Sequence, residues 1–339
     1  MNKDDTSTNS QTAATSARLI SLWLAVCMLL FMAGCGKTEP ENSEGASDSG
    51  AATASRDSSS SDDLQANGDK TTVRLLDAGA QPRTELRYKF QANQSEKMIM
   101  EMSMAMAMEI GEQKQPETQV TPTRTTMTID SKEISPEGDV RYEFKVEQVE
   151  VLPGPGADPA TVNAMKQMMN SMVGLSGSAT VTSRGFTKDA DIRIPAGIDP
   201  QMEQAMDNVN KSMDQMSAPL PVEPVGRGAR WLVTMPVETS GLKITQTVTY
   251  SLSEIQGDKV KCDLKIKQSA LPQEMDVPGA APGTKMLLES LTSSGEGTIE
   301  MQMTNLVPTS HIDMTTTNLV SANNQKIKST ARIGIKIHP

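Results

Sequence analysis

One unbroken run of alternating apolar residues constrains the fold more than any other feature of the chain. Apolar side chains occupy every second position from Met98 to Ile110, and all but the last are methionine. Successive side chains of a β-strand point to opposite faces, so this spacing places all of them on one face. A helix would scatter the same residues around its surface. The sequence therefore predicts a long amphipathic strand in a sheet with one methionine-rich face.

The same period of two recurs along the rest of the chain. Turn-prone residues at 137–139 and 257–258 join neighbouring runs and predict hairpins. The predicted strands are 86–90, 98–110, 125–134, 140–146, 231–237, 242–255, 260–266, 297–303, 312–319 and 327–337.

Two segments have helical spacing instead. Each opens with an aspartate and a proline, Asp158-Pro159 and Asp199-Pro200, which are typical of an N-cap and a first helical turn. A third, shorter helix is predicted at 285–291. Both longer segments present an apolar stripe: Val162, Met165, Met169 and Met172 in one, and Met202, Met206, Val209, Met213 and Met216 in the other.

Short phrases of the sequence recur after about 120 residues, which indicates an internal duplication. Gly138-Asp139 and 142–146 correspond to Gly257-Asp258 and 262–266, and 168–172 corresponds to 287–291. The predicted fold class is α+β, mostly antiparallel β, with two duplicated curved-sheet units and inserted helices. The predicted units are 81–218 and 227–339, joined by a Pro-rich link at 219–226.

The N-terminus has the features of an export signal. Residues 19–34 carry no charge, yet as a helix they would be only about 24 Å long at ~1.5 Å per residue, which is short for a membrane span. Met32-Ala33-Gly34-Cys35 resembles the lipobox of bacterial lipoproteins, although Met32 stands where leucine is usual and the preceding region is barely basic. The resemblance implies that 1–34 is a signal peptide and that Cys35 receives a diacylglycerol; the alternative is an uncleaved signal anchor. Residues 35–80, rich in Ser, Asp, Ala and Gly, are predicted to be a disordered tether.

Residues 80–339 also resemble a known group of proteins. The order of predicted strands and helices, with Leu220-Pro221, Glu223–Gly226 and Trp231, is similar to that of an uncharacterised family of bacterial lipoproteins. The architecture resembles the lipoprotein-carrier class, in which a curved antiparallel sheet wraps around helices. By analogy of fold, this resemblance implies binding of acyl chains.

The amino-acid composition argues against several classes of function. A net charge of −10 argues against nucleic-acid binding, which needs a clustered basic surface. The chain has two histidines, His311 and His338, and after the leader it keeps one internal thiol, Cys262. No phosphate loop, Cys-x-x-Cys pair or Gly-x-Ser-x-Gly elbow occurs, so we predict no enzyme activity, catalytic residues, cofactor or metal.

Three functional hypotheses remain, all for an envelope protein held to a membrane by its N-terminal lipid. The first is a module that binds an apolar ligand or lipid between the methionine-rich sheet and the helices. The second is a structural or interaction protein with a packed core. The third is Cu(I) binding by the thioethers of Met98–Met108, since thioethers are soft ligands. The predicted ligand-contacting residues are Met100, Met102, Met104, Met106, Met108, Met165, Met169, Met206 and Met213.

Overall fold

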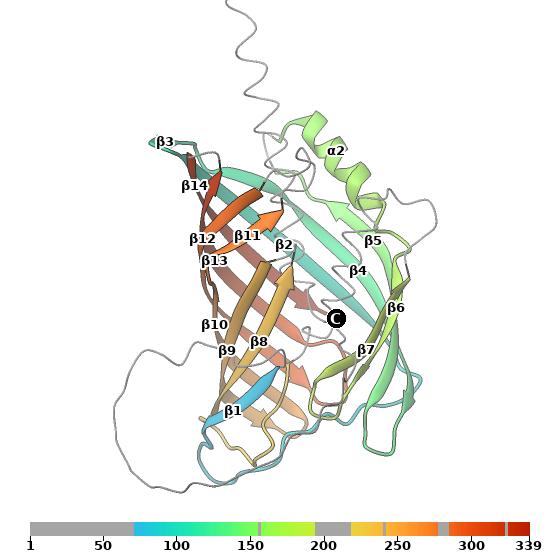
Figure 1. Cartoon of the computed structure of the whole chain (residues 1–339). Helices are drawn as coiled ribbons and strands as arrows, with labels where there is room; N and C mark the ends of the chain where they lie inside the picture. The colour runs from blue at the N-terminus through green and yellow to red at the C-terminus, as the bar shows by residue number, and fades with distance from the viewer. Residues whose placement is uncertain (1–70, 155–156, 194–217, 240–241, 277–284, 323–324) are drawn as a thin grey trace, which may run out of the picture.

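The computed structural model describes residues 71–154, 157–193, 218–239, 242–276, 285–322 and 325–339 (Figure 1). The signal peptide, Cys35 and the helix predicted at 199–216 lie outside the described residues.

The described residues form a single fourteen-stranded antiparallel sheet (Figure 1). Two short strands are off its main path: β11 (Gln273–Asp276) pairs with β12, and β3 (Gln113–Lys114) pairs with β2. From one edge to the other, the main path is β1 (Thr72–Asp77), β8 (Arg230–Thr239), β9 (Leu242–Gln256), β10 (Lys259–Ala270), β12 (Lys285–Gln302), β13 (Thr309–Ala322), β14 (Gln325–His338), β2 (Ser95–Ile110), β4 (Thr118–Ile134), β5 (Val140–Val151), β6 (Ser176–Val181) and β7 (Thr187–Arg193).

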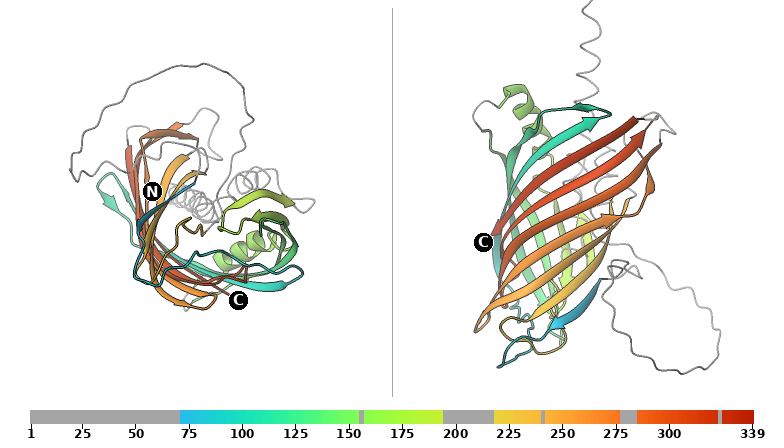
Figure 2. Two further views of the ribbon diagram at one scale, coloured as in Figure 1. Left: turned by 90° about the horizontal axis from the view of Figure 1, so that it is seen from below. Right: turned by 90° about the vertical axis from the view of Figure 1, so that its left-hand side faces the viewer.

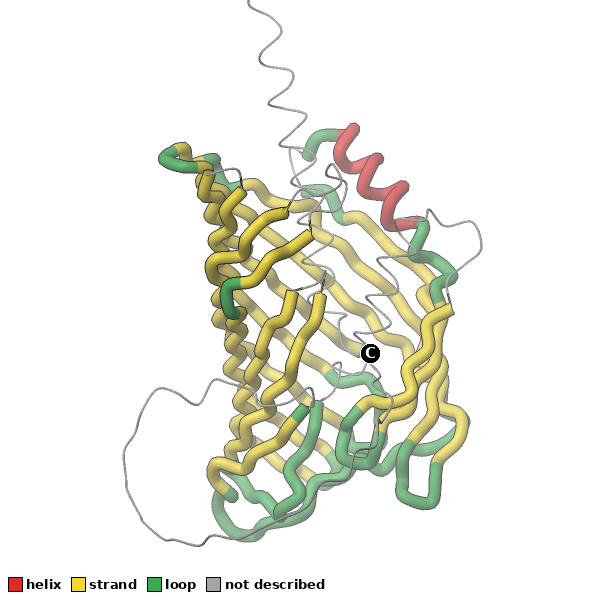
Figure 3. Tube along the Cα trace, viewed as in Figure 1, coloured by secondary structure: helices red, strands yellow, loops and turns green. Residues whose placement is uncertain are grey.

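The predicted α+β class is wrong, because the protein is nearly all antiparallel β. Figure 3 shows one helix beside the strands, and it is the one helix of the described residues, α2 (Pro159–Asn170). The two predicted units are also not separate sheets. Strand β14 of the second half pairs with β2 of the first along almost its whole length, so a single sheet continues through both halves.

The helix predicted at 285–291 is the first part of β12. Leu288 is fully buried and Leu291 is 3 % exposed, although an odd number of positions separates them. A β-bulge causes this spacing: Leu288 pairs with Val320 and Ser290 with Leu319, so one extra residue lies between two inward-facing leucines. Apolar residues three apart suggested a helix, whereas a bulged strand has the same spacing.

The chain before β2 also differs from the prediction. Residues 72–77, within the predicted tether, form β1 at the edge of the sheet beside β8. Residues 86–90 were predicted as a strand, but they join no ladder. Leu86 and Phe90 are nevertheless buried, because this segment crosses one end of the sheet (Figure 1).

The sheet curves strongly. Seen from below, it has the outline of an open C, with α2 on the inner side (Figure 2, left). Strand β10 shows how the two faces differ: Val260, Cys262, Leu264 and Ile266 are buried, whereas the alternating lysines and Asp263 are exposed. Apolar side chains thus line the inner face, and charged or short polar side chains cover the exposed face.

The two halves share a pairing register. In the first, Val140 pairs with Val181 and Phe144 with Gly177. In the second, Val260 pairs with Met301 and Leu264 with Gly297. Each residue of the second set lies the same distance along the chain from its counterpart in the first, as the predicted duplication requires. The equivalence breaks at 168–172 and 287–291, which are helix in one half and strand in the other.

Candidate functional site

The methionine stripe lies on the inner face of β2, as its alternation predicts. Met104, Met106 and Met108 are 3, 5 and 6 % exposed and belong to the largest core cluster. Met100 and Met102 are only partly buried and pack against the same cluster. The structure therefore brings all five of these predicted residues together.

The helical methionines lie elsewhere. Met165 and Met169 pack against Val146, Val149 and Val151 of β5 in a second cluster. Helix α2 begins where predicted, since Asp158 Oδ2 accepts hydrogen bonds from the backbone nitrogen of Thr161 at 2.8 Å and from its hydroxyl at 2.7 Å. The structure therefore places the methionines of β2 and α2 in separate clusters. Met206 and Met213 lie outside the described residues.

Two closing segments, 84–90 and 218–229, cross the lower end of the inner face (Figure 1). The indole Nε1 of Trp231 donates to the carbonyl oxygen of Pro219 at 3.1 Å. The Tyr88 hydroxyl donates to Met301 Sδ at 3.2 Å. Trp231 has no exposed surface and stacks on Tyr250, with 5.2 Å between ring centroids. Aromatic side chains therefore close this end of the apolar face.

Two arginines hold the second closing segment. Arg87 donates to the carbonyl oxygens of Pro221 and Val222, both at 3.0 Å, and Arg184 donates to that of Leu220 at 2.9 Å. Burial, followed by the charge of Arg87, lowers the pKa of Arg184. Both side chains thus satisfy main-chain acceptors of a segment that has no ladder.

A polar row interrupts the apolar inner face. Cross-strand pairing aligns Gln246 of β9, Gln268 of β10, Ser293 of β12 and Thr316 of β13. Gln268, Ser293 and Thr316 are 3, 6 and 2 % exposed. Buried polar side chains are costly unless they are hydrogen-bonded, and these four bond to one another along the row. We call these four residues the polar row.

The hydrogen bonds of the polar row have one direction. Gln268 Nε2 donates to Gln246 Oε1 at 2.6 Å, and Ser293 Oγ donates to Gln268 Oε1 at 2.9 Å. A serine hydroxyl has a single proton, so the 2.8 Å bond between Ser293 and Thr316 must be donated by Thr316. In the next row, Ser329 donates to Asn318 Oδ1. The amide oxygens of Gln268 and Asn318 therefore each already accept a hydrogen bond from a serine hydroxyl.

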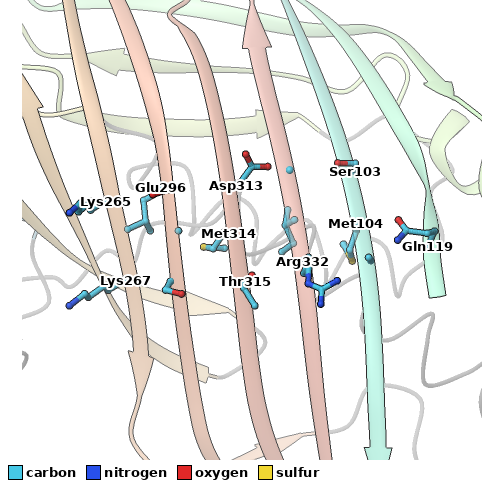
Figure 4. Close-up of a pocket in the computed structure, with 16 residues that line it drawn as sticks. Ser103, Met104, Gln119, Lys265, Lys267, Glu296, Asp313, Met314, Thr315 and Arg332 are labelled. Carbon is cyan, nitrogen blue, oxygen red and sulfur yellow. The ribbon is translucent and has the colours of Figure 1, made fainter. Parts of the chain in front are cut away.

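The other face of the same strands carries a groove of about 660 Å³ (Figure 4). Two parallel cross-strand rows of side chains form its walls. Backbone between the rows forms the floor, because the intervening side chains belong to the inner face. One wall is Lys265, Glu296, Asp313, Gly334 and Ser103, and the other is Lys267, Ser294, Thr315, Arg332, Ala105 and Gln119.

The groove has mixed charge. Among the described residues, Lys265, Lys267 and Glu296 have no ion-pair partner. Arg332 pairs with Glu117 at 2.5 Å, on the margin of the groove. At Gly334 a Cβ atom would lie 2.8 Å from Ser103 Oγ and 3.3 Å from Asp313 Oδ1, so glycine lets these two oxygen atoms approach the floor.

The one internal cysteine and the two histidines lie in surroundings that are common in folded proteins. Cys262 has no exposed surface, and burial raises the pKa of its thiol to about 12. His311 lies on the exposed face, 3.1 Å from Asp313, and His338 is exposed near the C-terminus. Within the described ranges, no three His, Cys, Asp or Glu side chains cluster closely enough to hold a metal ion. No helix of the described part is long and apolar enough to cross a membrane.

Sequence reasoning missed both the polar row and the groove. A signal for the row exists in β10, where Gln268 continues the alternation of Leu264 and Ile266 and so occupies an inward position. The groove left no such signal, because its walls are ordinary exposed residues of six strands.

Comparison with known proteins gives no family assignment. No protein-family model matches the chain, and no curated protein matches it. The resemblance to bacterial envelope lipoproteins therefore stays a prediction from the sequence.

Proposed function

We propose that this chain is a lipid-anchored envelope protein that binds an apolar ligand, such as an acyl chain, on the inner face of its sheet. The anchor would be a diacylglycerol on Cys35. The inner face provides a broad apolar surface with flexible thioether side chains, which adapt to irregular apolar shapes.

One row of the inner face carries the proposal. This row crosses eight strands without a polar side chain. At three of its positions the residue is neither β-branched nor aromatic, so the surface there is more flexible. Its members are Val233, Val248, Ile266, Gly295, Met314, Ile333, Met104 and Val120. Six of these eight residues are buried, and Gly295 and Val120 are half-buried, so a ligand would bind against this row by displacing the side chains that cover it. Binding sites for lipids and other apolar ligands are lined predominantly by apolar side chains of this kind.

The test uses the chain from residue 36 onward, purified without detergent. Native mass spectrometry should detect a co-purified lipid, and a fluorescent fatty acid should bind. Neighbouring residues on opposite faces offer a matched pair of variants. Met102→Gln places an amide on the inner face and should weaken uptake several-fold, whereas Ser103→Gln on the exposed face should leave it unchanged. A wild-type protein with no bound lipid and no uptake would refute the proposal.

A second candidate is an interaction protein of the envelope, and the exposed-face groove favours it. Lys265 and Lys267 project from one strand without ion-pair partners among the described residues. Unpaired cations of this kind steer association with an anionic partner. The double variant Lys265→Glu/Lys267→Glu should then abolish salt-sensitive retention on isolated envelope fragments. Retention equal to wild type would count against this candidate.

A further inference from the structure

In the polar row and in the row next to it, two side-chain amides have N–H groups without a hydrogen-bond acceptor among the described residues. Gln246 accepts from Gln268 through Oε1, but its own Nε2 has no acceptor among the described residues. Asn318 accepts from Ser329 through Oδ1, and its Nδ2 likewise has no described acceptor. The spare capacity of both amides consists of N–H donors, because their oxygens already accept protons.

These donors can be reached. In the described part of the chain, Arg184 Nε is the one fully buried side-chain nitrogen or oxygen without a partner. The two amide nitrogens also have no partner among the described residues, yet they are not fully buried: Gln246 is half-buried and Asn318 is 5 % exposed. An unpartnered amide in contact with an apolar surface has more to gain from a ligand acceptor than one in open water.

The surroundings of these donors carry no charge. The polar row continues across β14 and β2 as Ala331 and Met106, and Asn318 and Ser329 lie between Leu291 and Met108 in the next row. On its other side the polar row adjoins the apolar row that contains Ile266 and Met314. An anionic group would find no counter-ion among these described side chains and would lose its hydration. An uncharged acceptor, such as a carbonyl oxygen, would lose far less.

We infer that the donors of Gln246 and Asn318 bind the carbonyl oxygens of ester-linked acyl chains, whose hydrocarbon lies on the neighbouring apolar row. This inference rests on the proposed function and adds a ligand class to it. Gln246 and Asn318 lie on strands three places apart, about 14 Å at ~4.8 Å per strand, which is farther than the two ester carbonyls of one glycerol can reach, so each donor binds one ester carbonyl. The expected ligand at each donor is a diacyl lipid recognised at its uncharged glycerol-ester region, with its charged headgroup held away from the inner face.

The experiment compares two phospholipids with the same headgroup and chain length, one with ester-linked and one with ether-linked chains. Wild-type protein should bind the diester lipid about fivefold more tightly, since one net hydrogen bond of about 1 kcal/mol at each donor corresponds to roughly that ratio. In Gln246→Leu/Asn318→Leu the preference should disappear through weaker diester binding, while diether binding stays unchanged. Gln302→Leu, the same chemical change at an exposed end of β12, is the matched control and should keep the preference.

The outcomes separate this inference from the proposed function. Equal binding of both lipids by wild type would overturn the inference and leave apolar-ligand binding in place. A double variant that loses both lipids equally, with an unchanged thermal transition, would also overturn it, because carbonyl recognition affects only the ester. Binding of neither lipid by wild type would overturn the proposed function itself.

Discussion

The indole nitrogen of Trp231 donates its proton to the carbonyl oxygen of Pro219 at 3.1 Å, in a site with no solvent access to the ring. This bond joins the second closing segment to β8, at the lower end of the inner face. Pro219 begins the Pro-rich stretch and its carbonyl has no ladder partner, so the indole supplies an interaction that secondary structure does not. The Trp231 indole therefore holds this segment over the apolar face together with Arg87 and Arg184.

Trp231→Phe should destabilise the protein by roughly 1–3 kcal/mol, because it leaves the buried carbonyl of Pro219 without a donor. Urea titration followed by circular dichroism measures the change. Tyr250→Phe is the control, since the Tyr250 hydroxyl has no hydrogen bond to a described residue. If both variants unfold at the same urea concentration, the bond to Pro219 contributes nothing.

The buried thiol of Cys262 should make stability fall in alkali. Its pKa is about 12 in the folded protein against an ordinary value of 9.0, so between these values the unfolded chain has lost a proton that the folded chain retains. Stability is then fully present below about pH 9 and is lost progressively above it, by roughly 1 kcal/mol at about pH 10. Half-buried Tyr88 and buried Tyr250, whose pKa values are also raised by loss of solvation, add to the same trend.

Comparing urea midpoints of wild type and Cys262→Ala at about pH 8 and about pH 10 isolates the contribution of the thiol. The loss between the two pH values should be smaller in the variant. Native Cys262 should also resist iodoacetamide until urea unfolds the chain. Rapid alkylation under native conditions would contradict its burial.

Asp158→Ala should loosen the start of α2. The carboxylate accepts two hydrogen bonds from Thr161, and these bonds lower the pKa of Asp158. Amide exchange at Thr161 and Val162 should accelerate several-fold in the variant, while β5 keeps its protection. The depressed pKa means that the cap is complete above about pH 4 and weakens as the pH falls below that. Unchanged exchange in α2 would show that packing on β5 alone holds the helix.

Replacing Met102, Met104 and Met106 together by leucine separates packing from copper binding. Leucine has a similar volume, so stability should change by less than about 1.5 kcal/mol per site if these residues are core. Cu(I) affinity, measured by competition with a chromogenic chelator, should be unchanged. A large loss of Cu(I) affinity in a stably folded variant would support the thioether hypothesis instead.

Cys35→Ser should prevent lipidation and leave either an unprocessed precursor or a soluble species. Two acyl chains suffice for stable anchoring, at ~0.8 kcal/mol per buried methylene. Intact mass of the membrane-extracted wild type should show cleavage before Cys35 and an acyl addition. A mass equal to the whole chain from Met1 would identify a signal anchor. Limited proteolysis should first cut between Gly36 and Lys70 and leave the body from β1 (Thr72–Asp77) onward intact.

Much of the strand content could be predicted because alternation is a local property. The residues from Met98 to Ile110 reveal their common face by spacing alone, and the Asp158-Pro159 signal placed α2 correctly. The helix predicted at 285–291 failed because local spacing cannot distinguish a helical turn from a β-bulge. Pairing on both sides of β12 decides that choice, and it involves residues far away in the chain.

The sequence by itself determined which residues of each strand face inward, because side-chain alternation follows from backbone geometry within a few residues. Only the tertiary structure decided which strands are neighbours. It pairs β1 with β8, β14 with β2, and aligns Gln246, Gln268, Ser293 and Thr316 in one row. Which strands are neighbours depends on non-local hydrogen bonding and on the register of every intervening strand. The sequence alone therefore could not place the proposed carbonyl-binding donors beside the apolar row.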